Sequence, residues 1–115
     1  MRQPTIDRAV FDDLKQTAGA EFVVELVDTF LVEAPGMLDD LRRAFAAGDA
    51  DRFRRAAHSL KSNGNTFGAL TLGGMAREIE LGGLEPTRNA GGAPLDALAS
   101  EYARVAQALA ELKHG

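Results

Sequence analysis

The chain has no cysteine among its 115 residues, only two histidines, and no apolar run that approaches the length of a membrane-spanning helix. Without cysteine there are no disulfides, thiolate nucleophiles or cysteine metal sites. Charged residues interrupt the N-terminal stretch, so we expect neither a secretory signal peptide nor a membrane anchor. These absences make the cytoplasm the expected compartment.

The chain also lacks the glycine-rich GxxxxGK[ST] loop that cradles nucleotide phosphates. Its paired glycines, Gly73-Gly74 and Gly82-Gly83, have no strand context of a nucleotide-binding fold. We therefore expect that the chain is not itself a kinase. The net charge of −4 argues against non-specific nucleic-acid binding.

The composition is that of an ordinary soluble globular protein, with 45% apolar and 26% charged residues. A chain of this length can bury one modest core but not two. We expect residues 1–115 to form a single domain.

Helical periodicity dominates the chain, and no strand pattern competes with it. A first short helix is predicted to end near Gly19 and a second near Gly48. Pro35 either kinks this second helix or begins a new segment, and the unbroken apolar stripe favours the kink. Asp49 or Asp51 is expected to cap a third helix. Apolar stripes extend the pattern, and the residues expected to face the core are Ile6, Val10, Phe11, Leu14, Phe22, Leu26, Phe30, Ala34, Met37, Leu38, Leu41, Phe45, Leu72, Met75, Ala76 and Ile79.

Two glycines in the middle of the chain receive different interpretations. Gly64 shares the apolar stripe of the third helix and is predicted to allow close packing of a neighbouring helix, whereas Gly68 is predicted to end that helix. Residues 82–92 are predicted to be a loop, and a last helix is expected to start near Pro94. This last helix repeats apolar residues at steps of three and four: Leu95, Leu98, Tyr102, Val105, Leu109 and Leu112.

Long helices with apolar stripes and short connections pack as antiparallel bundles. The predicted fold is therefore all-α, an antiparallel up-down four-helix bundle with a short extra N-terminal helix across one end. The phenylalanines and Tyr102 are expected in its core, and the penultimate residue His114 in a frayed tail.

The third predicted helix has two distinct faces when its residues are placed at about 100° each. Its apolar face consists of Phe53, Ala56, Ala57, Leu60, Gly64 and Phe67. Its polar face consists of Asp51, Arg54, Arg55, His58, Lys61, Ser62 and Asn65. His58 is thus expected to face solvent, where its imidazole offers a nucleophilic nitrogen.

His58 lies in a basic segment of an acidic protein. Residues 42–61 contain six cations and two carboxylates. Arg54, Arg55 and Lys61 are three or four positions from His58, about 5–6 Å away on a helix surface. Cations there attract an anion that arrives at the ring, and a phosphoryl group suits such a site. A solvated helix face with ordinary ion pairs is the alternative interpretation.

The sequence around this histidine resembles the histidine-containing phosphotransfer (HPt) domains of multistep two-component signalling. The motif residues are His58-Ser59-Leu60-Lys61-Ser62 and, ten positions after the histidine, Gly68-Ala69. The segments Phe30-Leu31-Val32-Glu33-Ala34-Pro35, Ala47-Gly48-Asp49 and Ile79-Glu80 extend the likeness over nearly the whole chain. Ser62 departs from the pattern, because the family usually has glycine there.

The resemblance implies that His58 accepts a phosphoryl group from a receiver-domain aspartate and passes it to a second receiver. It implies that Lys61 neutralises the phosphoryl oxygens and that Glu80 accepts the other ring N–H. Ser62 either donates a hydrogen bond or crowds the site. The expected docking surface consists of Arg54, Arg55, Asn65 and Gly68.

The same resemblance defines the expected partners. They are receiver domains of response regulators and of hybrid sensor kinases, which supply the Mg²⁺, so this chain needs no cofactor or metal of its own. A monomer is expected, with no nucleic-acid or membrane partner.

Three other functions are alternatives to phosphotransfer. The first is the phosphorylatable N-terminal module of a chemotaxis-type kinase, which would require a longer parent gene. The second is a helical-bundle adaptor that is not phosphorylated. The third is a histidine-based hydrolase, but the sequence has no acid or nucleophile at a recognisable spacing from His58.

Overall fold

The structure is a computed structural model that describes residues 5–113, so His114 lies outside the described residues. Six helices follow one another within this range, and none of its residues is in a strand. The helices are α1 (Arg8–Ala18), α2 (Ala20–Ala47), α3 (Ala50–Thr66), α4 (Leu70–Gly82), α5 (Leu84–Asn89) and α6 (Ala93–Leu112).

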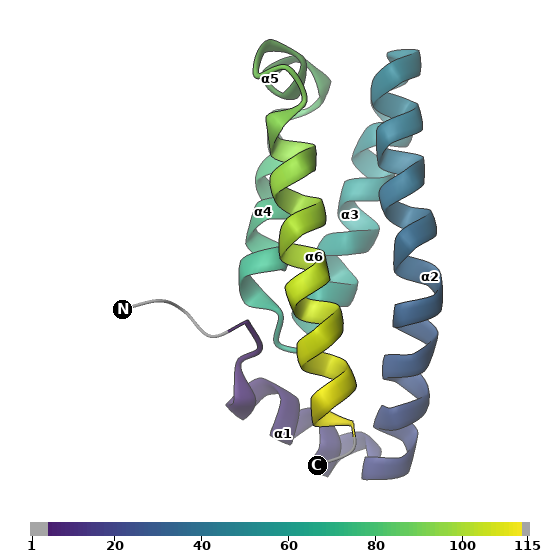
Figure 1. Cartoon of the computed structure of the whole chain (residues 1–115), viewed down its shortest axis with the longest axis vertical. Coiled ribbons are helices and arrows are strands. Elements are labelled where there is room, and N and C mark those ends of the chain that lie inside the picture. The colour runs from purple at the N-terminus through teal and green to yellow at the C-terminus, as the bar shows by residue number, and fades with distance from the viewer. Residues whose placement is uncertain (1–4, 114–115) are drawn as a thin grey trace.

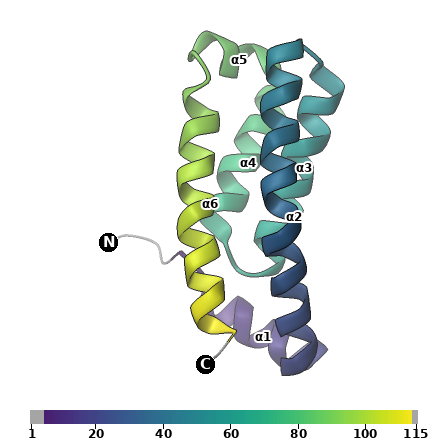
Figure 2. The same ribbon diagram turned by 45° about the vertical axis from the view of Figure 1, so that its right-hand side comes forward.

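Helices α2, α3, α4 and α6 lie side by side and alternate in direction, while α1 crosses one end of the bundle (Figures 1 and 2). Short α5 lies at the opposite end (Figure 1). The predicted antiparallel four-helix bundle with an extra N-terminal helix is thus confirmed. Within residues 5–113, no helix combines the length and apolarity needed to cross a membrane.

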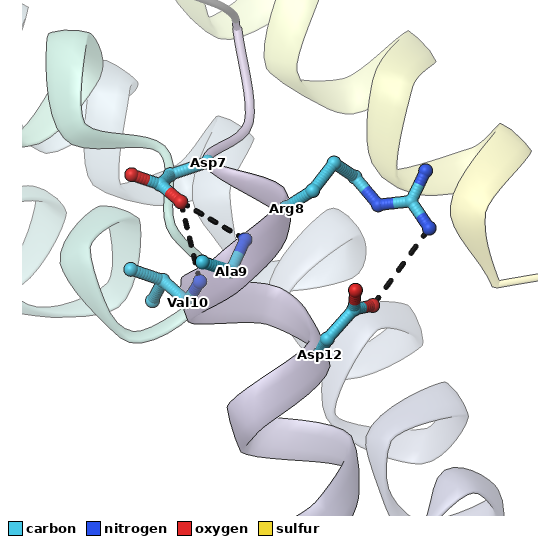
Figure 3. Close-up of polar contacts among 5 residues, drawn as sticks. All are labelled: Asp7, Arg8, Ala9, Val10 and Asp12. Atoms are coloured by element: carbon cyan, nitrogen blue, oxygen red, sulfur yellow. Dashed lines mark hydrogen bonds and ion pairs between the residues drawn. The ribbon is translucent and has the colours of Figure 1, made fainter.

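Helix α1 begins at a well-formed cap (Figure 3). The Asp7 carboxylate accepts hydrogen bonds from the backbone N–H groups of Ala9 at 3.0 Å and Val10 at 3.3 Å, which satisfies two of the donors that a helix leaves free at its N-terminus. Arg8 and Asp12 add an exposed ion pair at 3.7 Å, one turn apart, which contributes little to stability. The cap fixes the backbone of Asp7 for a second contact.

That second contact is with Gly68, in the turn between α3 and α4. The Asp7 backbone N–H donates to the Gly68 carbonyl at 2.8 Å. Gly68 is buried and has a left-handed φ of +83°, and a Cβ there would lie 2.7 Å from the Asp7 carbonyl oxygen. Gly68 therefore ends α3 as predicted. Its burial under the N-terminal segment excludes it from the docking surface predicted from the sequence.

Helix α2 runs continuously through Pro35. Its buried core stripe follows steps of three, four and seven residues: Val23, Val27, Phe30, Ala34, Leu41 and Ala44. Phe22 lies one position off this stripe and is 51% exposed, so its predicted place in the core was wrong. Gly48 ends the helix in the left-handed region, and Asp49 caps α3 by accepting from the Arg52 N–H at 3.1 Å.

Helices α3 and α4 form the most extensively packed pair among the described elements. Gly64 lies where they meet, and a Cβ on it would be 3.4 Å from both the Ala69 carbonyl oxygen and the Gly73 nitrogen. The prediction that Gly64 is a close-packing point is confirmed. The two backbones approach each other because neither glycine has a side chain.

The prediction of a loop over residues 82–92 was wrong, because α5 occupies residues 84–89. Pro86 lies in the first turn of α5, where a backbone N–H has no partner within the helix, so proline is tolerated. Leu84 and Thr87 turn inward and are buried, which anchors the helix. The sequence pattern was too short to reveal it.

Helix α6 buries one residue that its predicted apolar repeat did not include. Glu101 is buried at the position next to Tyr102, and its carboxylate accepts two hydrogen bonds from Arg104. Tyr102 is half-buried, and its ring meets that of Phe30 edge to face at 5.9 Å. The guanidinium satisfies the carboxylate, and the tyrosine still covers the core.

Candidate functional site

The site is centred on His58, in the middle of α3. Its side chain is 57% exposed, while the neighbouring Ala57 and Leu60 are fully buried. The buried neighbours fix which face of α3 turns outward. The solvent-facing position predicted for His58 is therefore confirmed.

Glu80, on α4, connects His58 with Lys61. One carboxylate oxygen, Oε2, lies 2.9 Å from His58 Nδ1. The other oxygen, Oε1, lies 2.7 Å from the Lys61 ammonium. The Glu80 side chain is only 21% exposed, so this carboxylate is shared between two partners in a sheltered position.

The surroundings keep Glu80 ionised. The Lys61 hydrogen bond is the main cause that lowers the pKa of Glu80 below its usual 4.5, with a smaller contribution from His58, while partial burial opposes both. An ionised carboxylate can only accept hydrogen bonds, so Nδ1 of His58 must carry the proton. In the neutral ring the free lone pair is then on Nε2.

A depression of about 360 Å³ opens beside the imidazole, lined by Arg54, Arg55, His58, Ser59 and Glu80. Arg54 lies against the start of α5, and its Nη2 is 3.4 Å from where a Cβ on Gly83 would be. The missing side chain of Gly83 leaves room for this guanidinium. Both arginines were predicted from the sequence as site residues, whereas Ser59 was predicted only as part of the motif and Gly83 was not placed at the site.

A second depression, of about 220 Å³, adjoins the first and shares Arg55 and Ser59 with it. It lies between α2 and α3 and is also lined by Met37, Asp40, Arg52 and Ala56. Arg52 and Asp40 close an ion pair at 2.7 Å across the two helices. The sequence did not predict this second depression, because Asp40 and Arg52 belong to separate helices.

Two further predicted residues lie toward the end of α3, Ser62 one turn and Asn65 two turns after His58. Ser62 and Asn65 are both exposed. The Asn65 amide reaches over to α4, where it fills the space that a side chain on Gly73 would need. Gly68 is the predicted site residue that the structure does not bring to this surface.

The site combines the His58 imidazole, the Glu80 carboxylate and three cations, which are Arg54, Arg55 and Lys61. Among residues 5–113, no group of three or more histidine, aspartate or glutamate side chains is placed to hold a metal ion. The arrangement offers a nucleophilic nitrogen with a fixed proton on the opposite side of the ring, and cations for an incoming anion.

Comparisons with known proteins agree with this geometry. The chain is similar over 98% of its length to the crystal structure of histidine-containing phosphotransfer protein B (HptB) from Pseudomonas aeruginosa PAO1, with 28% sequence identity, a TM-score of 0.82 and 97% of that chain covered. No curated protein sequence matches the chain. The family model described as the Hpt domain matches residues 25–114. The chain therefore belongs to the Hpt domain family.

Proposed function

We propose that this protein is a histidine phosphotransfer protein in which His58 carries the phosphoryl group between receiver-domain aspartates of a two-component phosphorelay. The observation that carries the proposal is the 2.9 Å contact between His58 Nδ1 and Glu80 on an exposed helix face. It directs the Nε2 lone pair away from Glu80, so a partner's phosphoaspartate can approach it.

Transfer then requires one bond to form and one to break. The Nε2 lone pair attacks the phosphorus of an aspartyl phosphate as the bond from phosphorus to the aspartate oxygen breaks, and the aspartate leaves as a carboxylate. The ring keeps its Nδ1 proton and becomes a phosphorylated imidazolium. The Glu80 carboxylate stabilises that positive charge through the Nδ1–H bond. The reverse sequence delivers the group to the next receiver.

Partners and location follow from the same proposal. The partners are receiver domains of response regulators and hybrid sensor kinases, which supply the Mg²⁺ for their own aspartates. The protein acts as a cytoplasmic monomer and single domain that carries the phosphoryl group without nucleotide. The basic residues around His58 suit an acidic receiver pocket.

The direct test is incubation with phosphorylated receiver domains from the source genome. We expect label to move to this protein and to be acid-labile and base-stable, as a phosphoramidate bond is. Binding of a receiver without label transfer would instead favour a non-phosphorylated adaptor, and the proposal would be wrong.

Glu80 variants separate the hydrogen bond from the charge. Glu80→Ala removes both and should slow single-turnover transfer about 10–100-fold, the range for a lost charge-assisted hydrogen bond. Glu80→Gln keeps an acceptor for Nδ1–H and should be slowed less. Nitrogen NMR of the imidazole should show the Nδ1–H tautomer in the wild type and a mixture in Glu80→Ala. Equal rates in all three proteins would remove Glu80 from the mechanism.

The lowered pKa of Glu80 also predicts a pH dependence of stability. Folding favours the ionised carboxylate, so its contribution to the free energy of unfolding is present above the usual pKa of 4.5 and is lost as the pH falls through the lower, folded-state value. The stability difference between wild type and Glu80→Gln, measured by urea denaturation, should shrink over that acid range. A difference that is constant with pH would contradict this.

Ser62 tests how closely the receiver approaches. The side chain is exposed one turn from His58, so Ser62→Leu should block transfer without unfolding the bundle, because an interface core tolerates little added bulk. Ser62→Gly should preserve or modestly raise the transfer rate. If the glycine variant loses activity instead, the hydroxyl bonds the phosphoryl group. If leucine is tolerated as well as glycine, docking over this face is wrong.

A further inference from the structure

Two of the three cations near His58 differ from most other cations of residues 5–113 in having no anionic partner. Eight of the described lysines and arginines form ion pairs with carboxylates: Arg8, Arg42, Arg43, Arg52, Lys61, Arg88, Arg104 and Lys113. Within residues 5–113, Arg54 and Arg55 have no such pair. Both belong to the depression beside the imidazole. Their guanidinium donors are thus available for an anion that enters from outside.

The direction of the His58 side chain places its ring on the same side as these arginines. In an α-helix the Cα–Cβ bond tilts toward the N-terminus, so a side chain covers the turn before its own Cα. Arg54 and Arg55 lie on that preceding turn. The depression that they line extends to His58 and Ser59 but does not include Ser62. The imidazole and the two guanidinium groups therefore share one depression, which a group bonded to Nε2 can occupy.

Lys61, by contrast, is already engaged. Its ammonium is 2.7 Å from Glu80 Oε1, and its side chain is only 25% exposed. To contact a phosphoryl group directly, the ammonium would have to share its three N–H donors between that group and Glu80, or leave Glu80 Oε1 without this partner. Its present contact instead holds the carboxylate that receives the His58 Nδ1–H.

From these contacts we propose that the three cations have two different roles. This proposal rests on the proposed function of His58. Arg54 and Arg55 bind the phosphoryl oxygens of phosphorylated His58, and Lys61 is a positioning residue that acts through Glu80. Planar guanidinium groups suit this role because they can donate two parallel hydrogen bonds to phosphate oxygens. The space beside Gly83 lets Arg54 take up its position.

The test uses the phosphorylated protein without any receiver, so that binding of the phosphoryl group is separated from docking. Phosphoramidate transfers its phosphoryl group to imidazole nitrogen with loss of ammonia, and the reaction is run in a His114→Gln background. Phosphorus NMR then follows the titration of the phosphoryl group. Removing a bound cation should raise its midpoint, because a nearby positive charge favours the dianion.

Arg54→Gln and Arg55→Gln should each raise that midpoint by about 0.3–0.7 pH units, which corresponds to the two- to fivefold effect of an exposed ion pair. Lys15→Gln is the matched control: it removes the same charge from α1, where Lys15 also has no ion pair among the described residues, and should not shift the midpoint. In the wild type, phosphorylation should also move the Nε–H signals of Arg54 and Arg55.

Lys61→Gln has a different expected signature. It should change the Nδ1–H signal of unphosphorylated His58, with Lys61→Arg restoring it, and should move the phosphoryl midpoint less than either arginine variant. A larger shift for Lys61→Gln than for the arginine variants would overturn the proposal and make Lys61 the phosphoryl ligand. Unshifted midpoints in Arg54→Gln and Arg55→Gln would overturn it too, while His58 phosphorylation itself would stand.

Discussion

Replacement of His58 by glutamine is expected to abolish phosphoryl uptake from a phosphorylated receiver, by at least about 1,000-fold, because the variant lacks the nitrogen that forms the bond to phosphorus. The His58 side chain is mostly exposed, and Glu80 is its one polar partner among residues 5–113, so the helical content should be unchanged. The measurement is transfer of radiolabel, with circular dichroism of the same samples.

The second histidine of the chain provides the matched control. His114→Gln should accept label at the wild-type rate. Label that persists on His58→Gln and disappears from His114→Gln would move the phosphorylated residue to the C-terminus and overturn the assignment to α3.

Gly68→Ala should cause the largest loss of stability that a single methyl group produces in this fold. The left-handed φ of +83° costs an ordinary residue about 1–2 kcal/mol. The added Cβ would also lie 2.7 Å from the Asp7 carbonyl oxygen, an overlap with backbone that only a shift of the N-terminal segment relieves. We expect a total of about 2–4 kcal/mol and a fall in Tm of about 8–20 °C.

Substitutions at two other glycines separate the cost of the left-handed backbone from the cost of the overlap with Asp7. Gly91 has a left-handed φ of +65° but open space around a Cβ, so Gly91→Ala should show the backbone cost alone. Gly74 is helical and also has open space, so Gly74→Ala should stabilise the protein by about 0.4–1 kcal/mol. If Gly68→Ala is no worse than Gly91→Ala, the contact with Asp7 does not hold the α3–α4 turn.

Features that depend on local periodicity could be predicted from the sequence. The two faces of α3, an aspartate cap at position 49 or 51, and the exposure of His58 follow from residues within a few turns of one another, and the structure has the cap at Asp49. The contact between His58 and Glu80 joins positions that are 22 residues apart. Helical periodicity does not predict a contact between residues so far apart in the sequence, and only the family resemblance suggested this contact.

Other features depend on tertiary packing and were missed for that reason. The burial of Gly68 requires α1 to cross the end of the bundle and place Asp7 over the turn. Short α5 is anchored by the burial of Leu84 and Thr87 rather than by a repeating pattern. The ion pair between Lys61 and Glu80 depends on the distance between α3 and α4. A helical wheel of α3 alone does not give that distance.

The glycine contact between α3 and α4 has a consequence for how this site can evolve. Gly64 and Gly73 bring the two backbones together, and a glutamate side chain is short, so Glu80 reaches His58 only at that helix spacing. A side chain that extends beyond Cβ at position 64 would push α4 outward, because a Cβ there already lies 3.4 Å from the α4 backbone, and would lengthen the hydrogen bond that sets the tautomer. Reactivity at the surface can therefore be adjusted by mutations in the interior that touch neither a partner nor the phosphoryl group.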